Sequence, residues 1–209
     1  MRRALASAAA GLVLVAGAGA GAAACSSSST STSSPSTSSA ASAASSSAVP
    51  KETNPPGDIP DTQVYVPWSP SGGGYTVKVP EGWSRTAQGS ATVFADKYNS
   101  VRAERVAATS APTVQSVRTT DIPAIQAKSK GFSLVNVSVV QRKGGSAVLA
   151  EYHADSPPDQ VTGKSVTLDV QRYVFYKAGK GEVVLTLSGA SNADNVDPWR
   201  TVTDSFRWS

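Results

Sequence analysis

Apolar and polar residues alternate along seven stretches of this chain, as they do in β-strands that bury one face. The stretches predicted as strands are residues 75–79, 91–95, 101–108, 132–141, 147–154, 166–177 and 182–188. The pair Gly144-Gly145 predicts a tight hairpin turn. On the longest strand, Val174 lies on one face and Tyr173 and Phe175 on the other. Because both faces are partly apolar, we expect both to be covered.

Between Thr113 and Lys130 the apolar spacing changes to that of a helix. Val117 falls on the inward side of the first part, and Ile122 on the inward side of the second. Pro123 sits just inside the second part, where proline is tolerated in a first helical turn. The pattern leaves open whether this segment is one kinked helix or two short ones.

A second helix is predicted near the end of the chain. Asp197 and Pro198 form an N-cap and first-turn pair, and Trp199, Val202 and Phe206 repeat at three and four residues. The order of elements is then three strands, a helix, four strands and a helix. This order predicts an α+β fold, with one antiparallel sheet of about seven strands and helices packed on its faces.

The first 24 residues have the pattern of an export signal. Arg2 and Arg3 precede an uncharged run of small and apolar residues, 4–24, that ends just before Cys25. Residues 22–25, Ala-Ala-Ala-Cys, resemble a bacterial lipobox, although position 22 carries Ala where Leu is most common. Cys25 is the one cysteine of the chain and has no disulfide partner, so lipidation explains it better than plain secretion or an uncleaved anchor.

The resemblance to bacterial lipoproteins implies a location for the protein. In that class the cysteine carries a diacylglyceryl thioether, and the signal is cut just before it. The acyl chains enter the outer leaflet of the cytoplasmic membrane, and two chains suffice for stable attachment. We therefore expect Cys25 to be lipidated and the mature chain to lie on the extracytoplasmic face of the cell membrane.

Two segments without regular periodicity follow the cysteine. Residues 26–49 are almost entirely Ser, Thr and Ala, so with Cys25 they are expected to form a disordered tether spanning on the order of 27 Å. Residues 50–74 are rich in Pro and Gly and predict an extended arm with few backbone bonds of its own. Trp68 is expected to clamp this arm to the domain, with a free role toward a partner as the alternative. The domain itself is expected over residues 75–209.

Charge excludes some function classes. Without Arg2 and Arg3, the 19 basic residues of the chain become 17, against 15 acidic residues. Because positive and negative charges are so nearly equal in number, the sequence does not predict the basic patch that nucleic-acid binding needs. No nucleic-acid partner is therefore expected. The run Gly72-Gly73-Gly74 is not followed by Lys-Ser or Lys-Thr, so it is not a phosphate-binding loop.

A short strand runs from Tyr75 into Val-Pro-Glu-Gly-Trp, which ends at Trp83. This motif resembles the opening of the actinobacterial LpqN-type lipoproteins, which belong to the PsbP-like fold group. The resemblance extends to Trp208 as an order of elements, with few motifs at the level of single residues. It implies an antiparallel sheet with helices on its faces.

The sequence offers few candidates for chemistry. His153 is the only histidine, and alternation places it on the same face as Glu151. No Gly-x-Ser-x-Gly motif supplies a nucleophile for it. His153, Asp155 and Asp159 could be gathered around a cation, but their spacing does not guarantee the ligands that a metal needs. Asp169, on a partly polar face, is a further carboxylate. No catalytic, metal or cofactor residue is predicted.

The large aromatic residues are expected in the core. They are Trp83, Trp199, Trp208, Phe94 and Phe206. The sequon Asn136-Val137-Ser138 lies inside a predicted strand and is discounted as a glycosylation site.

The leading hypothesis is a membrane-anchored lipoprotein whose domain binds or assists another component of the cell envelope without catalysis. The alternatives are a hydrolase of envelope lipid or glycan, and a carrier of a small apolar ligand between helix and sheet. Converging titratable groups in a pocket would favour the hydrolase, and a cavity would favour the carrier.

Overall fold

The structure, a computed structural model, describes residues 57–209, so the signal, Cys25, the tether and the first residues of the arm lie outside the described residues. The strands are β1 (Tyr65–Trp68), β2 (Tyr75–Pro80), β3 (Ser84–Gln88), β4 (Ala91–Asp96), β5 (Asn99–Val106), β6 (Ser133–Arg142), β7 (Gly145–Asp155), β8 (Thr167–Lys177), β9 (Gly181–Ala190) and β10 (Arg207–Trp208). The helical elements are α1 (Val114–Ser116), η1 (Val117–Asp121), α2 (Ile122–Gln126) and α3 (Val196–Ser205).

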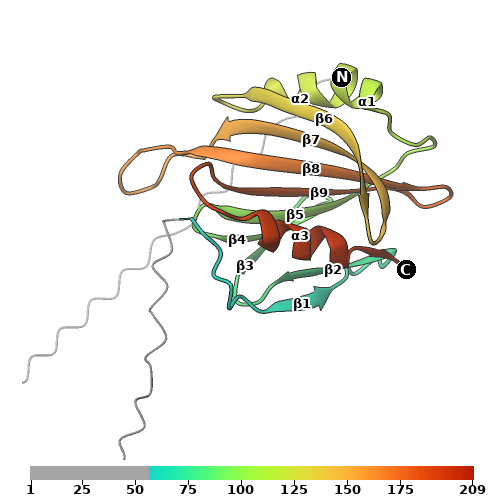
Figure 1. Ribbon diagram of the computed structural model, residues 1–209, viewed down its shortest axis with the longest axis horizontal. Helices are drawn as coiled ribbons and strands as arrows, with labels where there is room; N and C mark the ends of the chain where they lie inside the picture. Colours follow the sequence, from blue (N-terminus) through green and yellow to red (C-terminus); the bar gives the residue numbers. More distant parts are fainter. Residues whose placement is uncertain (1–56) are drawn as a thin grey trace, which may run out of the picture. The chain divides into compact units, whose positions relative to one another are not determined.

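Seven strands form one antiparallel sheet in the order β3-β4-β5-β9-β8-β7-β6 (Figure 1). The predicted α+β class and the seven-stranded antiparallel sheet are confirmed. The membership of the sheet differs in two places. β2 belongs to a separate three-stranded sheet with β1 and β10, and β3 takes its place at the edge of the large sheet. β3 was not predicted because all five of its residues are exposed, which removes the alternation of apolar and polar positions.

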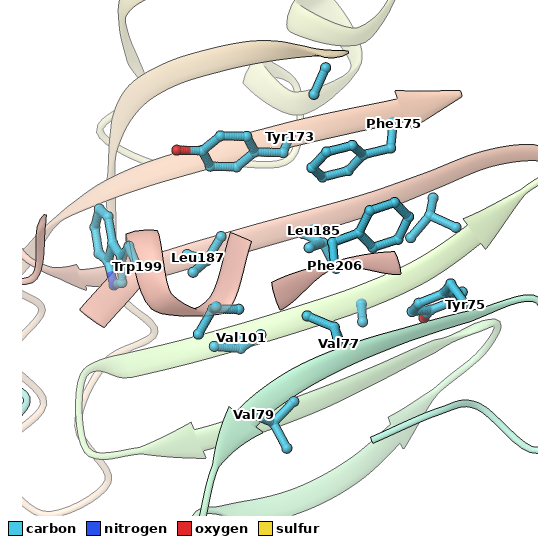
Figure 2. Packing of buried hydrophobic residues seen from close by; sticks show 14 of the residues in the cluster. Tyr75, Val77, Val79, Val101, Tyr173, Phe175, Leu185, Leu187, Trp199 and Phe206 are labelled. Carbon is cyan, nitrogen blue, oxygen red and sulfur yellow. The ribbon is translucent and has the colours of Figure 1, made fainter. Parts of the chain in front are cut away.

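The three-stranded sheet and α3 cover one face of the large sheet (Figure 2). On that face, Phe206 stacks on Phe175 of β8, with ring centroids 4.2 Å apart. Both side chains are fully buried, together with Leu185 of β9. The main hydrophobic core therefore lies between the large sheet and the layer that α3 and β2 form.

All the aromatic residues predicted for the core lie in it or against it. Phe94, Trp199 and Phe206 are buried, and Trp83 and Trp208 are partly buried against the same cluster.

The predicted clamp by Trp68 is also seen. Its ring packs edge-on against Phe94 at 5.2 Å and against Tyr75 at 6.0 Å. The arm differs from the expectation, because Tyr65–Trp68 pairs with β2 as a strand. This strand was not predicted because it contains Pro67, although proline is compatible with an edge strand.

α1, η1 and α2 form one continuous helical run on the opposite face of the sheet, against β6, β7 and β8. The run begins after Thr113, whose Oγ1 accepts a hydrogen bond from the Ser116 backbone N–H at 3.0 Å. Its middle turn is π-helical, with the Ile122 N–H bonded to the Val117 carbonyl. In an α-helix of 3.6 residues per turn, residues five apart point in different directions, but the wider turn lets Val117 and Ile122 both face the sheet. The segment is therefore one helical run with a π-turn.

The start of α3 corrects a prediction. The N-cap is Asn195, and Asp197 lies inside the first turn. The Asn195 side chain makes no capping bond. Its Oδ1 accepts a hydrogen bond from the backbone N–H of Ile59 at 2.9 Å, so the residue ties the beginning of the described chain to the helix.

Candidate functional site

The polar side chains singled out in the sequence meet on the α3 face of the sheet, where β7 lies beside β8. The register pairs His153 with Asp169 and Glu151 with Gln171. The prediction that His153 and Glu151 share a face is confirmed, and Asp169 and Gln171 share it with them. β7 and β8 are each hydrogen-bonded to a strand on both sides, so the backbone that carries these four side chains is rigid.

His153 is held by Asp169. Its Nδ1 lies 2.7 Å from Asp169 Oδ1, and the two side chains are 42% and 39% exposed. A carboxylate at Nδ1 favours the tautomer with the proton on Nδ1, which leaves Nε2 as a hydrogen-bond acceptor. The pair is therefore open to solvent, oriented, and able to interact with a ligand through Nε2.

A separate chain of hydrogen bonds begins beside this pair, at Glu151, and runs toward the far end of α3. Gln171 Nε2 donates to Glu151 Oε1 at 3.4 Å, and the Tyr173 hydroxyl donates to Gln171 Oε1 at 2.8 Å. Arg142 Nη2 donates to the Tyr173 hydroxyl at 2.8 Å, and its Nε donates to Thr203 Oγ1 at 3.1 Å. Burial raises the pKa of Tyr173 despite the hydrogen bond from Arg142, so its hydroxyl stays protonated and fixes Gln171.

A groove of about 220 Å³ lies over these residues, between the sheet and the start of α3. His153, Asp169, Glu151 and Gln171 line it together with residues of β6 and α3. At its rim Val135 is 57% exposed and Val196 is 62% exposed, and Trp199 forms part of its wall. An open groove with a fixed polar floor and apolar edges is the form that ligand sites commonly take.

Ser133 is a neighbour of this site that the sequence did not reveal. It pairs with His153 across β6 and β7, so Ser133, His153 and Asp169 stand in one row on three adjacent strands. A regular hairpin that pairs Arg142 with Gly145 would bring Ser133 opposite Ala154. A bulge between residues 134 and 136 shifts the register by one residue and creates the row.

The possible metal cluster of His153, Asp155 and Asp159 is not formed. His153 bonds to Asp169, and the Asp159 carboxylate caps its own turn by accepting hydrogen bonds from the Val161 and Thr162 N–H groups at 3.1 and 2.7 Å. These bonds, the one from Thr162 first, lower the pKa of Asp159. Within residues 57–209, no three His, Cys, Asp or Glu side chains are grouped as metal ligands.

The discounted glycosylation sequon lies within a strand of the large sheet. Asn136 lies on β6 and is exposed, next to buried Val137. Cys25, the predicted lipidation site, lies outside the described residues. Among the helices of residues 57–209, none combines the length and the apolar character needed to cross a membrane.

No protein-family model matches this chain, and no curated protein matches it. The solved structures with similar folds include three from different organisms. The first is the Ran-binding protein Mog1p of Saccharomyces cerevisiae, with 10% identity, a TM-score of 0.44, and coverage of 62% of this chain and 78% of that one. The second is the cyanobacterial PsbP (CyanoP) of Synechocystis, with 17% identity, a TM-score of 0.48, and coverage of 73% and 98%.

The third is LpqN of Mycobacterium tuberculosis, which is described as involved in cell envelope biogenesis. It has 16% identity, a TM-score of 0.43, and coverage of 71% of this chain and 92% of that chain. The neighbours thus include a PsbP and an LpqN. With every TM-score below 0.5 and every identity below 20%, these likenesses carry no argument about the function of this chain.

Proposed function

We propose that this protein is an LpqN-type lipoprotein, anchored through acylated Cys25 to the extracytoplasmic face of the cell membrane. The support is in the sequence: a basic start at Arg2 and Arg3, a small and apolar run, and a single cysteine at its end. Residues 26–49 tether the folded domain to the anchor. The domain contains its own complete core within residues 57–209.

The domain acts as a non-catalytic binding module for a component of the cell envelope. The observation that carries this function is the groove beside α3, whose polar floor is held by the bonds of His153 to Asp169 and of Tyr173 to Gln171. Two carboxylates, Glu151 and Asp169, make the floor rich in acceptors. It therefore suits a ligand that presents hydroxyl or amine donors to the floor and an apolar flank to the rim.

A pull-down from solubilised envelope membranes tests this function. The bait is the chain produced without residues 1–25, and the matched variant is Val196→Glu, which changes an exposed rim residue without touching the core. We expect a component that the wild-type bait retains and the variant releases. Equal recovery by the two baits would show that the groove is not the binding site.

The row of Ser133, His153 and Asp169 favours a second function, hydrolysis of an envelope ester. It has the residue types of a nucleophile, base and orienting acid, with the carboxylate at Nδ1 as that chemistry requires. No hydrogen bond joins Ser133 to His153 in residues 57–209, although catalytic bonds can be long before substrate binds. Release of acid from short-chain esters by the wild-type chain, and its loss in Ser133→Ala, would establish this second function.

A further inference from the structure

Two arginines stand in one row on the face of the sheet opposite the groove. Thr186 of β9 pairs with Arg102 of β5 on one side and with Arg172 of β8 on the other. Adjacent strands are about 4.8 Å apart, so the two arginine Cα atoms are about 10 Å apart on the same face. Long side chains from such positions can reach a common ligand.

Arg172 lacks the partners that a buried guanidinium requires. Its side chain is 20% exposed, and its Nε is buried with no hydrogen-bond partner among residues 57–209. Its carboxylate contact in that part of the chain is Asp121, with Oδ2 3.8 Å from Nη2. That separation is too long for a hydrogen bond. A mostly buried cation with an unpaired donor is strongly unfavourable unless an acceptor reaches it.

A hollow of about 340 Å³ lies in front of Arg172, beside α2. Arg102 and Lys128 also line it, as do the acidic residues Glu104 and Asp121. Arg102 is already engaged, because its Nη2 donates to Glu104 Oε2 at 2.8 Å. Lys128 is exposed and has no carboxylate within 4.0 Å in the described part of the chain.

The side chains that line the hollow carry one more positive than negative charge. Burial of Glu104 opposes ionisation, but hydrogen bonds from Ser90 and Arg102 outweigh it and lower the pKa of this carboxyl. Glu104 is therefore ionised and paired with Arg102. Among the residues that line the hollow, Arg172 and Lys128 then face Asp121 as two cations against one acid, with Asp121 too far from Arg172 to satisfy its donors. Glu182 of β9 lies outside the lining but near the same charges, since burial and then Asp121 raise the pKa of its carboxyl while Arg172 lowers it.

We propose that this hollow binds a small oxyanion, a carboxylate or a phosphate group, through Arg172, with Lys128 as the second cation. A guanidinium has donors only, so its missing partner must be an acceptor, and its planar fork matches two oxygens of one oxyanion. The site lies on the face opposite the groove, so it goes beyond the function proposed above and does not depend on it.

Calorimetric titration of the chain produced without residues 1–25 tests the site, with sodium phosphate in one arm and sodium acetate in the other. Sodium chloride at matched ionic strength controls for screening. We expect saturable binding of one of the two anions, and its identity distinguishes phosphate from carboxylate chemistry. We also expect that anion to raise the melting temperature of the wild-type chain.

Variants locate the binding. Arg172→Gln keeps a donor but removes the charge, so we expect at least a tenfold loss of affinity. Ala124→Glu, at an exposed position of α2 that lines the hollow, places a carboxylate beside Arg172 and should abolish binding without disturbing the core. His153→Ala, on the other face, should bind as the wild type does. Absence of saturable binding of both anions, or unchanged affinity in Ala124→Glu, would overturn the proposal.

Discussion

The side chain of Asn195, at the start of α3, donates a hydrogen bond from Nδ2 to Oδ1 of Asn99 on β5, 3.1 Å away in the interior of the domain. Both residues are 4% exposed. Asn99 Nδ2 also donates to the Gly57 carbonyl at 2.8 Å. Gly189 lies against the pair, and a Cβ at that position would come within 2.6 Å of both amides. The two amides thus fasten the beginning of the described chain to the sheet and to α3.

We expect Asn195→Leu to lower the free energy of unfolding by about 2 to 4 kcal/mol. The substitution leaves the Ile59 N–H and the Asn99 Oδ1 without their partner, and each unsatisfied buried group costs about 1 to 3 kcal/mol. Urea unfolding followed by circular dichroism measures the change, with Asp197→Asn, an exposed substitution on the same helix, as the control. A loss below about 0.5 kcal/mol, the usual range for surface substitutions, would show that the amide pair is not a fastening point.

Truncation separates the tether from the arm. A chain that starts at Pro50 should unfold at the same temperature as one that starts at Ser26, since residues 26–49 are expected to bury nothing. A chain that starts at Tyr75, the predicted domain boundary, should be much less stable, because it lacks β1 and the packing of Trp68 on Phe94. Calorimetry compares the three. A melting temperature several degrees lower for the Pro50 chain would mean that the tether packs on the domain.

Two tyrosines should make the fold sensitive to alkali. Burial raises the pKa of Tyr65 to about 12, and burial together with the charge of Glu104 raises the pKa of Tyr75 to about 12. The unfolded value is about 10, so the folded state favours the neutral phenols. Their contribution to stability is therefore complete below pH 10 and is lost as the pH rises through 12.

Tyr65→Phe isolates one of these groups. The Tyr65 hydroxyl is buried without a hydrogen-bond partner among residues 57–209, so at pH 7 its removal should leave stability unchanged or slightly higher. Between pH 10 and 12 the variant should lose less stability than the wild-type chain. Urea midpoints measured across that range provide the comparison, and parallel curves for the two proteins would contradict the assignment to Tyr65.

The anchor is tested at Cys25. Cys25→Ala should abolish incorporation of a labelled fatty acid and either release the protein from membranes or leave it as the uncut precursor. The wild-type chain should be labelled and should sediment with membranes. Continued membrane association of the variant after signal cleavage would show that another feature holds the protein there.

Local periodicity was sufficient to predict most elements of the fold. Every predicted strand is present, because each carries alternating apolar residues that face a core. Prediction failed where that signal is absent or misleading. β3 has no buried residue, and Pro67 obscured β1. Asp197-Pro198 has the residue types of a helix start, but the helix begins after Asn195. The sequence does not reveal this N-cap, because the Asn195 side chain bonds to Asn99 and Ile59 and makes no capping bond.

The candidate sites depend on strand register, which a single sequence does not contain. Alternation could place His153 and Glu151 on one face. It could not bring Asp169 opposite His153, since the sequence of the loop between β7 and β8 does not predict how the two strands align. The bulge that moves Ser133 opposite His153 has no sequence signature. The row of Arg102, Thr186 and Arg172 needs β5 beside β9, and these two strands are remote in the chain and adjacent only in the sheet.

The distinction between binding and catalysis is tested most directly at His153, the only histidine. A tuned acid or base is worth roughly a hundred to ten thousand-fold in rate, so a hydrolase that used the row of Ser133, His153 and Asp169 would lose that factor in His153→Ala. The measurement is recovery of the envelope component by the wild-type and His153→Ala chains, with ester hydrolysis assayed on the same preparations. A binding module predicts that both chains fold, that neither hydrolyses the ester, and that the variant retains less of the component, because it lacks one of the side chains that form the groove floor. Hydrolysis by the wild-type chain that disappears in a folded His153→Ala variant would contradict it.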